Sequence, residues 1–157
     1  MSSCFVEIGH HQKAKAGEHS YGDVILKRFI REENRRLVVL SDGMGSGIKA
    51  NVLASLTASM ALNFVSERKS IAEAFERIFN ILPECSVRKM GYATFTIIDM
   101  LDDCRVSLIV YDNPLPFLLR QGELVELEWQ STELATTGYC GRSVATASFE
   151  PLSGDRL

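Results

Sequence analysis

Two aspartates are the residues of this 157-residue sequence whose types and spacing most directly suggest chemistry. Asp42 and Gly43 end an apolar run, and Gly45 and Gly47 follow within the next four residues. A carboxylate at a strand end is held rigidly by the sheet, and hard divalent cations prefer oxygen ligands. Because glycine has no Cβ, the Gly43 carbonyl can also turn toward an ion. The stretch predicts either part of a metal site or an ordinary Asp-Gly turn.

One aspartate is not a metal site, and Asp23 is the candidate partner. It begins a predicted strand over residues 23–31, and a second predicted strand over 37–41 ends just before Asp42. If these strands pair antiparallel, the start of one lies beside the end of the other. The two carboxylates then meet at one edge of the sheet, with the carbonyl of Gly43 beside them.

Nucleotide-binding loops are the competing interpretations of these glycines. A dinucleotide fingerprint needs the third glycine one position later and a strand–helix alternation that is missing here. A Walker-type phosphate loop needs four residues between its glycines, followed by Gly-Lys-Ser/Thr, and this stretch does not supply them. In the Asp-x-Gly-x-Gly box of some kinases the glycines also stand one position later. A nucleotide-binding regulator therefore stays a remote alternative.

The elements that must position the aspartates form strands, then two adjacent helices, then more strands. Ile48, Val52, Leu56, Met60 and Phe64 step by four and predict a helix over 47–66 with one apolar stripe, while its alanines suggest close packing. Hairpin-length connections predict antiparallel pairing and an α+β fold. The other predicted elements are strands over 3–9, 92–100, 105–111 and 144–149, a helix over 70–82, a hairpin over 117–129 and a loop over 130–143.

The bulk composition is that of one ordinary globular domain. Hydrophobic residues make up 46% and charged residues 24%, and the net charge of −3 does not by itself favour nucleic acid or a membrane surface. No apolar run approaches 18 residues, so no membrane span is expected. The opening residues lack the pattern of a signal peptide, and the four cysteines form no CxxC pair. We therefore expect reduced thiols and a cytoplasmic protein.

The stretch LSDGMGSGIKAN resembles the Asp-Gly-Met-Gly-x-Gly segment of the SpoIIE-like branch of metal-dependent Ser/Thr protein phosphatases, the type 2C superfamily. The Gly-Asp pair at 22–23 resembles the family's earlier Gly-Asp at a strand start. Residues 92–127 resemble its two central strands, its proline loop and the hairpin after it. Residues 152–157 resemble its Gly-Asp-x-Leu entry into a late strand. The resemblance covers roughly residues 20–157.

This resemblance implies an αββα sandwich of antiparallel sheets with a helix pair. It implies two Mn²⁺ or Mg²⁺ ions bridged by a water that attacks phosphorus. Asp42 would bridge both ions, and Asp23 and the Gly43 carbonyl would complete the protein ligands of one. The implied substrate is phosphoserine or phosphothreonine on a regulatory protein of the anti-sigma-factor-antagonist type. The helix over 47–66 would be a possible homodimer surface.

The sequence also departs from the family pattern. A further Asp-Gly and a late Asp-Asp, which supply the other metal's carboxylates in the family, do not occur before the sequence ends at Leu157. We therefore expect a single domain over 1–157 without its C-terminal strands and last metal motifs. The alternative is a non-catalytic pseudophosphatase or protein-binding module. Asn113 stands where the family's proline loop usually has glycine, Tyr21 replaces a small residue, and Thr136-Thr137-Gly138 replaces Pro-Leu-Gly.

Overall fold

The structure is a computed structural model that describes residues 5–14, 16–17, 19–67, 77–78, 93–133 and 143–157. Its helix is α1 (Gly47–Ser66), preceded by the short 3-10 helix η1 (Arg31–Glu33). Its strands are β1 (Asp23–Ile30), β2 (Arg35–Gly43), β3 (Ala93–Met100), β4 (Val106–Tyr111), β5 (Leu118–Arg120), β6 (Glu123–Val125), β7 (Gln130–Glu133) and β8 (Ser143–Phe149).

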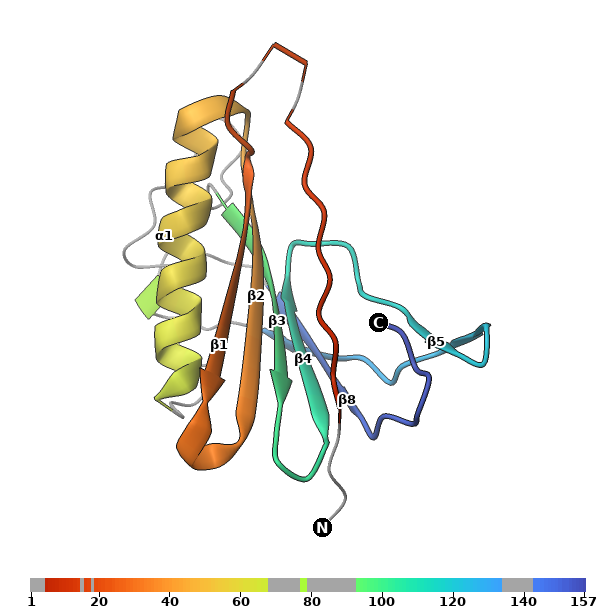
Figure 1. The fold of residues 1–157 in the computed structure, drawn as a ribbon. Helices are drawn as coiled ribbons and strands as arrows, with labels where there is room; N and C mark the ends of the chain where they lie inside the picture. Colours follow the sequence, from red (N-terminus) through yellow and green to blue (C-terminus); the bar gives the residue numbers. More distant parts are fainter. Residues whose placement is uncertain (1–4, 15, 18, 68–76, 79–92, 134–142) are drawn as a thin grey trace.

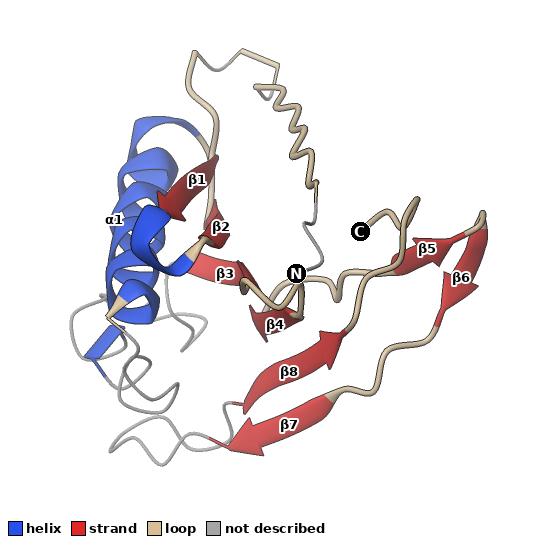
Figure 2. Cartoon of the chain, turned by 60° about the horizontal axis from the view of Figure 1, so that its bottom comes forward, coloured by secondary structure: helices blue, strands red, loops and turns tan. Residues whose placement is uncertain are grey.

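Six of the strands form one antiparallel sheet in the order β1-β2-β3-β4-β8-β7. Helix α1 lies along one face of this sheet, and the hairpin β5–β6 forms a separate two-stranded sheet on the side away from α1 (Figures 1 and 2). A single antiparallel bridge between Leu119 and Arg156 extends that second sheet. The predicted α+β class with antiparallel sheets is confirmed. The second predicted helix, over 70–82, lies outside the described residues except for 77–78.

Alternating side chains give the six-stranded sheet two apolar faces, as expected from the two-residue period of a strand. The face toward α1 carries Leu37 and Val39 from β2, packed with Phe95 and Ile97 from β3. The opposite face carries Val38, which packs in a separate cluster with residues of β4 and β8 and with Leu118 of the small hairpin. Asp42 stands four positions after Val38 on β2, so its side chain projects from the same face of the sheet, away from α1.

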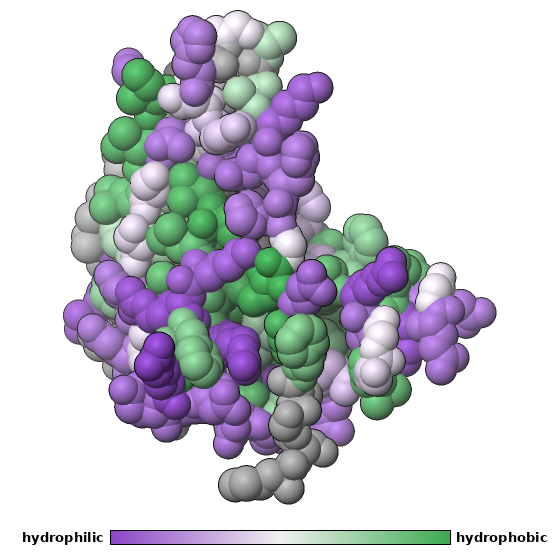
Figure 3. All heavy atoms as spheres, viewed as in Figure 1, coloured by the Kyte–Doolittle hydropathy of each residue, from purple (hydrophilic) through white to green (hydrophobic). Residues whose placement is uncertain are grey.

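The face that α1 buries differs from the predicted stripe. Ile48, Val52 and Leu56 are 74%, 57% and 42% exposed, and the buried residues are instead small ones: Gly47, Ala50, Ala54, Thr57, Ala58 and Ala61, with Leu62. A row of residues four apart turns about 40° per step around a helix with 3.6 residues per turn. The row therefore leaves the core along the helix, and only its later members, Met60 and Phe64, pack against the core. Figure 3 shows the hydrophobic surface over the upper part of α1.

Helix α1 has the length and composition of a membrane-crossing helix, which the sequence analysis did not expect. It has 20 residues, and the mean hydropathy of its most apolar window is 1.3. The core helix of a soluble protein meets the same criterion, and α1 lies against β1, β2 and β3 with its alanine face buried. Only 33% of that window is buried, so this packing accounts for part of its hydropathy, and exposed residues such as Ile48, Val52 and Leu56 contribute the rest.

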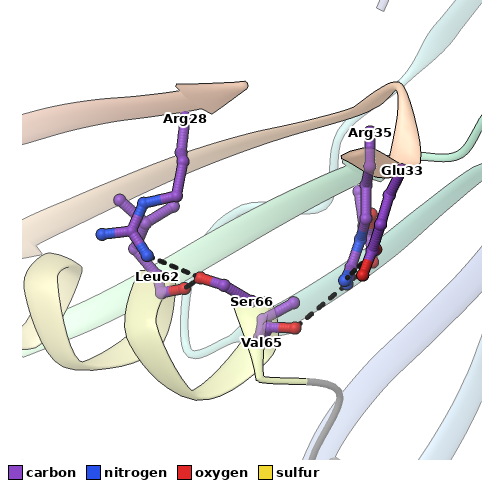
Figure 4. A network of polar contacts seen from close by, with 7 residues as sticks. Arg28, Glu33, Arg35, Leu62, Val65 and Ser66 are labelled. Carbon is purple, nitrogen blue, oxygen red and sulfur yellow. Dashed lines mark hydrogen bonds and ion pairs between the residues drawn. The ribbon is translucent and has the colours of Figure 1, made fainter. Parts of the chain in front are cut away.

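The C-terminal end of α1 is anchored to the sheet by two arginines (Figure 4). Arg28 of β1 donates to Ser66 Oγ at 2.7 Å and to Asn63 Oδ1 at 2.9 Å. Arg35 of β2, only 4% exposed, donates to the carbonyl of Val65 at 3.0 Å and pairs with both carboxylate oxygens of Asp99. The final carbonyls of a helix need such donors because no later turn supplies them.

Three expectations about other segments are wrong in the described residues. Residues 5–9 form no strand; this segment runs beside the sheet, where Lys27 Nζ donates to the carbonyl of Ile8 at 3.0 Å. The start of the predicted loop over 130–143 is strand β7, which has four exposed polar residues and so lacks the apolar alternation that identifies a strand. Cys104 is disulfide-bonded, whereas the sequence predicts free thiols.

Candidate metal centre

The two predicted acidic residues lie directly opposite each other at one end of the sheet. Strands β1 and β2 pair antiparallel, and the register places Asp23 across from Asp42. Residues directly opposite on paired strands project from the same face, with their Cβ atoms about 4.5–5.5 Å apart. The backbone N–H of Gly43 donates to the carbonyl of Gly22 at 3.2 Å, which continues the pairing beyond the aspartates. The predicted meeting of the two carboxylates is confirmed; their metal-binding role is a prediction.

The position after Asp42 must be glycine because the first turn of α1 lies against it. A Cβ on Gly43 would stand 2.1 Å from the carbonyl oxygen of Ala50 and 2.6 Å from its carbonyl carbon. Both are backbone atoms inside a helix, so they cannot move aside cheaply. The Asp-Gly sequence is therefore more than a turn: it brings the helix start, the strand end and the acidic pair together. We call Asp23, Asp42 and the Gly43 carbonyl the rim site.

The electrostatics of the rim site disfavour two bare negative charges. Partial desolvation of Asp42, its hydrogen bond with Asp23 and repulsion from that carboxylate together raise the pKa of Asp42 to about 6, although its side chain is still exposed to solvent. Two close carboxylates commonly retain one proton between them, because the second ionisation must overcome the first charge. A divalent cation can replace that proton and neutralise the pair. The arrangement thus has the charge and the donor atoms that a hard cation requires.

The rim site fits a Mn²⁺ or Mg²⁺ ion only in part. Two carboxylates and one carbonyl are oxygen donors of the right kind, but such ions take about six ligands, so water must fill the rest. Among the residues that the structure describes, no group of three or more His, Cys, Asp or Glu side chains lies close enough to bind one ion. The rim site therefore fits one partly hydrated cation.

Thr94 and Asn113 are neighbours of the rim site to which the sequence assigns no role there; Asn113 stands out in the sequence only as a departure from the family's proline loop. Thr94 of β3 lies across from Asp42, so Asp23, Asp42 and Thr94 form one row over three strands. Asn113, in the loop after β4, accepts a hydrogen bond from the Thr94 hydroxyl and donates its amide to Thr96 Oγ1 at 3.1 Å. The alternation in ATFTIIDM signals that both threonines share a face, but only the strand register shows which residues they face.

The histidines at the start of the chain do not join the rim site. His10 Nδ1 lies 3.2 Å from Lys27 Nζ, four positions along β1 from Asp23. Gln12 comes closest in this segment, since its side-chain amide donates to the backbone carbonyl of Asp23 at 2.9 Å. This contact holds the backbone at the start of β1 and does not involve the Asp23 carboxylate.

Comparison with known proteins agrees with the fold described above. The family model described as Stage II sporulation protein E (SpoIIE) matches residues 32–157. The PP2C phosphatase domain of SpoIIE from Bacillus subtilis, solved with a fragment of its regulatory domain, superposes with a TM-score of 0.71 at 20% identity, covering 92% of this chain and 41% of that one. RsbX in complex with magnesium gives a TM-score of 0.62 at 19% identity, covering 92% of this chain and 68% of that one.

A third solved structure and the curated proteins complete the comparison. The RsbU and RsbW domains of a Mycobacterium tuberculosis protein give a TM-score of 0.62 at 19% identity, covering 90% of this chain and 39% of that one. The chain thus spans about two fifths of the first two solved chains it matches. No curated protein matches it.

The sheet order and the helix on one face give this chain the fold of PP2C-type phosphatase domains. Within that class, the chain belongs to the SpoIIE family.

Proposed function

We propose that this chain is the metal-binding part of a protein serine/threonine phosphatase that acts on a phosphorylated regulatory protein. The observation that carries the proposal is the register that sets Asp23 opposite Asp42, beside the carbonyl of Gly43. The SpoIIE family membership supports the phosphatase class. The similarity to RsbX, solved with magnesium, supports a hard divalent cation as the cofactor.

The residues of the rim site have distinct roles in this proposal. The carboxylates of Asp23 and Asp42 hold the cation and supply the negative charge that balances it. The backbone of Gly43, fixed against Ala50 and Gly22, sets the position of the strand end. A bound Mn²⁺ or Mg²⁺ would make a coordinated water more acidic and draw negative charge from a phosphoryl group. By resemblance, Asp42 would serve both ions of a two-ion site, and Asp23 would serve one of them.

The proposed partner is a phosphorylated regulatory protein, of the anti-sigma-factor-antagonist type by resemblance. Solved structures similar to this chain include the RsbU and RsbW domains and a structure described for the bacterial stressosome.

The exposed residues Ile48, Val52 and Leu56 make α1 the proposed surface for a homodimer. Replacing Val52 with Ser should lower the mass measured by light scattering, and an unchanged mass contradicts the dimer. A cytoplasmic location stays a proposal, and the disulfide at Cys104 argues against it because disulfides persist in oxidising compartments.

Hydrolysis of p-nitrophenyl phosphate with Mn²⁺ tests the proposed chemistry. The wild-type chain is compared with Asp42→Asn and with Asp103→Asn, a matched change at an exposed acid in the turn between β3 and β4. We expect Asp42→Asn to abolish metal-dependent turnover and Asp103→Asn to leave it unchanged. Equal rates for wild type and Asp42→Asn would exclude the assigned chemistry.

The second candidate function is a metal-binding regulatory module without turnover. It is favoured because the described residues place only two acidic side chains at the rim, fewer than the family's two-ion site uses. Calorimetry with Mn²⁺ separates the candidates. Binding that depends on Asp42 without hydrolysis supports the module, whereas binding and hydrolysis that fail together in Asp42→Asn support the phosphatase.

A further inference from the structure

Asn113 joins a loop to the strand that faces the acidic rim. It lies in the connection between β4 and β5, directly after Asp112, whose backbone is left-handed with φ of 52°. Its half-buried side chain contacts two threonines, Thr94 and Thr96, which stand two residues apart on the same face of β3. The Asn113 amide thus accepts a hydrogen bond from one hydroxyl through its oxygen and donates one to the other through its nitrogen. Neither the aspartate pair nor the glycine loop requires this arrangement.

The direction of these hydrogen bonds determines what the Thr94 hydroxyl can do. A hydroxyl has one proton to donate, and in Thr94 that proton goes to Asn113 Oδ1. Asn113 is held in this orientation because its amide nitrogen donates to Thr96 Oγ1 at 3.1 Å, and Thr96 is buried. The hydroxyl of Thr94 therefore has lone pairs, and no proton, to offer to the acidic rim.

The strand register makes the direction of the Thr94 hydrogen bond relevant to cation binding. Thr94 is directly opposite Asp42, within reach of a rotated hydroxyl. A hydroxyl that donated to the Asp42 carboxylate would occupy a lone pair and stabilise the bare anion, and both effects oppose binding of a cation. A hydroxyl that only accepts can instead accept a hydrogen bond from a water bound to the cation.

We infer that Asn113 is a positioning residue of the rim site: by accepting the hydrogen bond that the Thr94 hydroxyl donates, it keeps the Asp42 oxygens available to a divalent cation. This inference rests on the proposed function, because it needs a cation at the rim. It assigns Asn113 an effect on affinity through Thr94, with no direct contact to the ion.

A double-mutant cycle with Mn²⁺ as the probe tests the inference. Isothermal calorimetry on the 157-residue chain measures Mn²⁺ affinity for wild type, Asn113→Ala, Thr94→Val and the double variant. We expect Asn113→Ala to weaken binding about five- to tenfold, the effect of one net hydrogen bond. Thr94→Val should bind within about twofold of wild type, and the double variant should match Thr94→Val, because the competing donor is gone.

Two matched variants control for structural damage. Asn34→Ala removes a comparable side-chain hydrogen bond, from Asn34 to Asp102, at the opposite end of the sheet and should leave Mn²⁺ affinity unchanged. Asn113→Asp keeps an acceptor oxygen for Thr94 and should bind Mn²⁺ at least as tightly as wild type. It also serves as the test variant if Asn113→Ala does not fold.

The possible failures are distinguishable. If Asn113→Ala weakens Mn²⁺ binding and the double variant binds just as weakly, Asn113 is only structural, and the inference is overturned. Weaker binding by Asn113→Asp, or wild-type affinity in Asn113→Ala, also overturns it. A wild-type chain that binds no Mn²⁺ overturns the proposed function, and the inference falls with it.

Discussion

Asp23 and Asp42 lie directly opposite each other on neighbouring antiparallel strands, at the end of the sheet where α1 begins. They stand nineteen positions apart in sequence, yet one hairpin register brings their carboxyl groups together. The pairing needs only that β1 starts where β2 ends, which an antiparallel hairpin with a short turn guarantees. The position of the acidic pair is thus set by the strand lengths and by the register of the hairpin.

The first prediction concerns the charge of the pair. Asp42→Asn removes one of two carboxylates from a site whose affinity depends on the number of charged ligands, so Mn²⁺ binding should weaken at least about tenfold. Calorimetry measures this directly, and Asp103→Asn is the matched control because Asp103 is exposed at a distant turn. An unchanged dissociation constant in Asp42→Asn would remove the rim site from consideration.

The second prediction concerns pH. The pKa of Asp42 is raised from 3.8 to about 6, so the folded state holds this proton more tightly than the unfolded state. The resulting stabilisation of the metal-free protein is fully present below about pH 4 and is lost as pH rises toward 6. Melting temperatures of wild type and Asp42→Asn across this range isolate the effect from other groups. The difference in melting temperature in favour of wild type should shrink with rising pH. A difference that stays constant contradicts the raised pKa of Asp42.

The same proton competes with the cation. Mn²⁺ affinity should be highest above about pH 6 and should fall as the pH drops below the pKa of Asp42, because the proton must leave before the ion binds. Calorimetry at several pH values measures both the affinity and the protons released. An affinity independent of pH between 5 and 7 would show that Asp42 does not ligate the ion.

The third prediction concerns the close approach of α1 to the strand end. Gly43→Ala places a Cβ 2.1 Å from the carbonyl oxygen of Ala50, so it should destabilise the fold by about 2–4 kcal/mol through forced backbone shifts. Gly22→Ala is the matched control, since its nearest neighbours would be 3.7 Å away, an ordinary contact. It should cost less than about 1 kcal/mol. Chemical denaturation measures both, and equal costs would contradict the tight approach.

The sequence predicts the strand pair and the acidic rim because these depend on local patterns. Alternation and the Asp-Gly signal in the segment 37–43 identify β2, and hairpin geometry then places Asp23. The buried face of α1 could not be predicted from its largest residues. Close packing of α1 against the sheet, seen at Ala50 beside Gly43, places small residues in the interface, and the distance between helix and sheet is a tertiary property. The hydrogen bonds of Asn113 could likewise not be predicted, since they join a loop to a strand seventeen or more residues away.

The last prediction concerns the anchor at the other end of α1. Arg35 is buried, and removing it leaves the Asp99 carboxylate without its cation and the carbonyl of Val65 without a donor. Loss of one partner from a buried ion pair typically costs about 3–5 kcal/mol, so Arg35→Met should lower the free energy of unfolding by that amount. Arg105→Met breaks only an exposed pair with Asp103, 3.8 Å apart, and should cost at most about 1 kcal/mol. Adding Asp99→Leu to Arg35→Met should recover part of the loss, because the uncompensated charge is then gone. Urea denaturation of the three variants measures these differences, and a double variant less stable than Arg35→Met alone would show that Asp99 has a second essential partner.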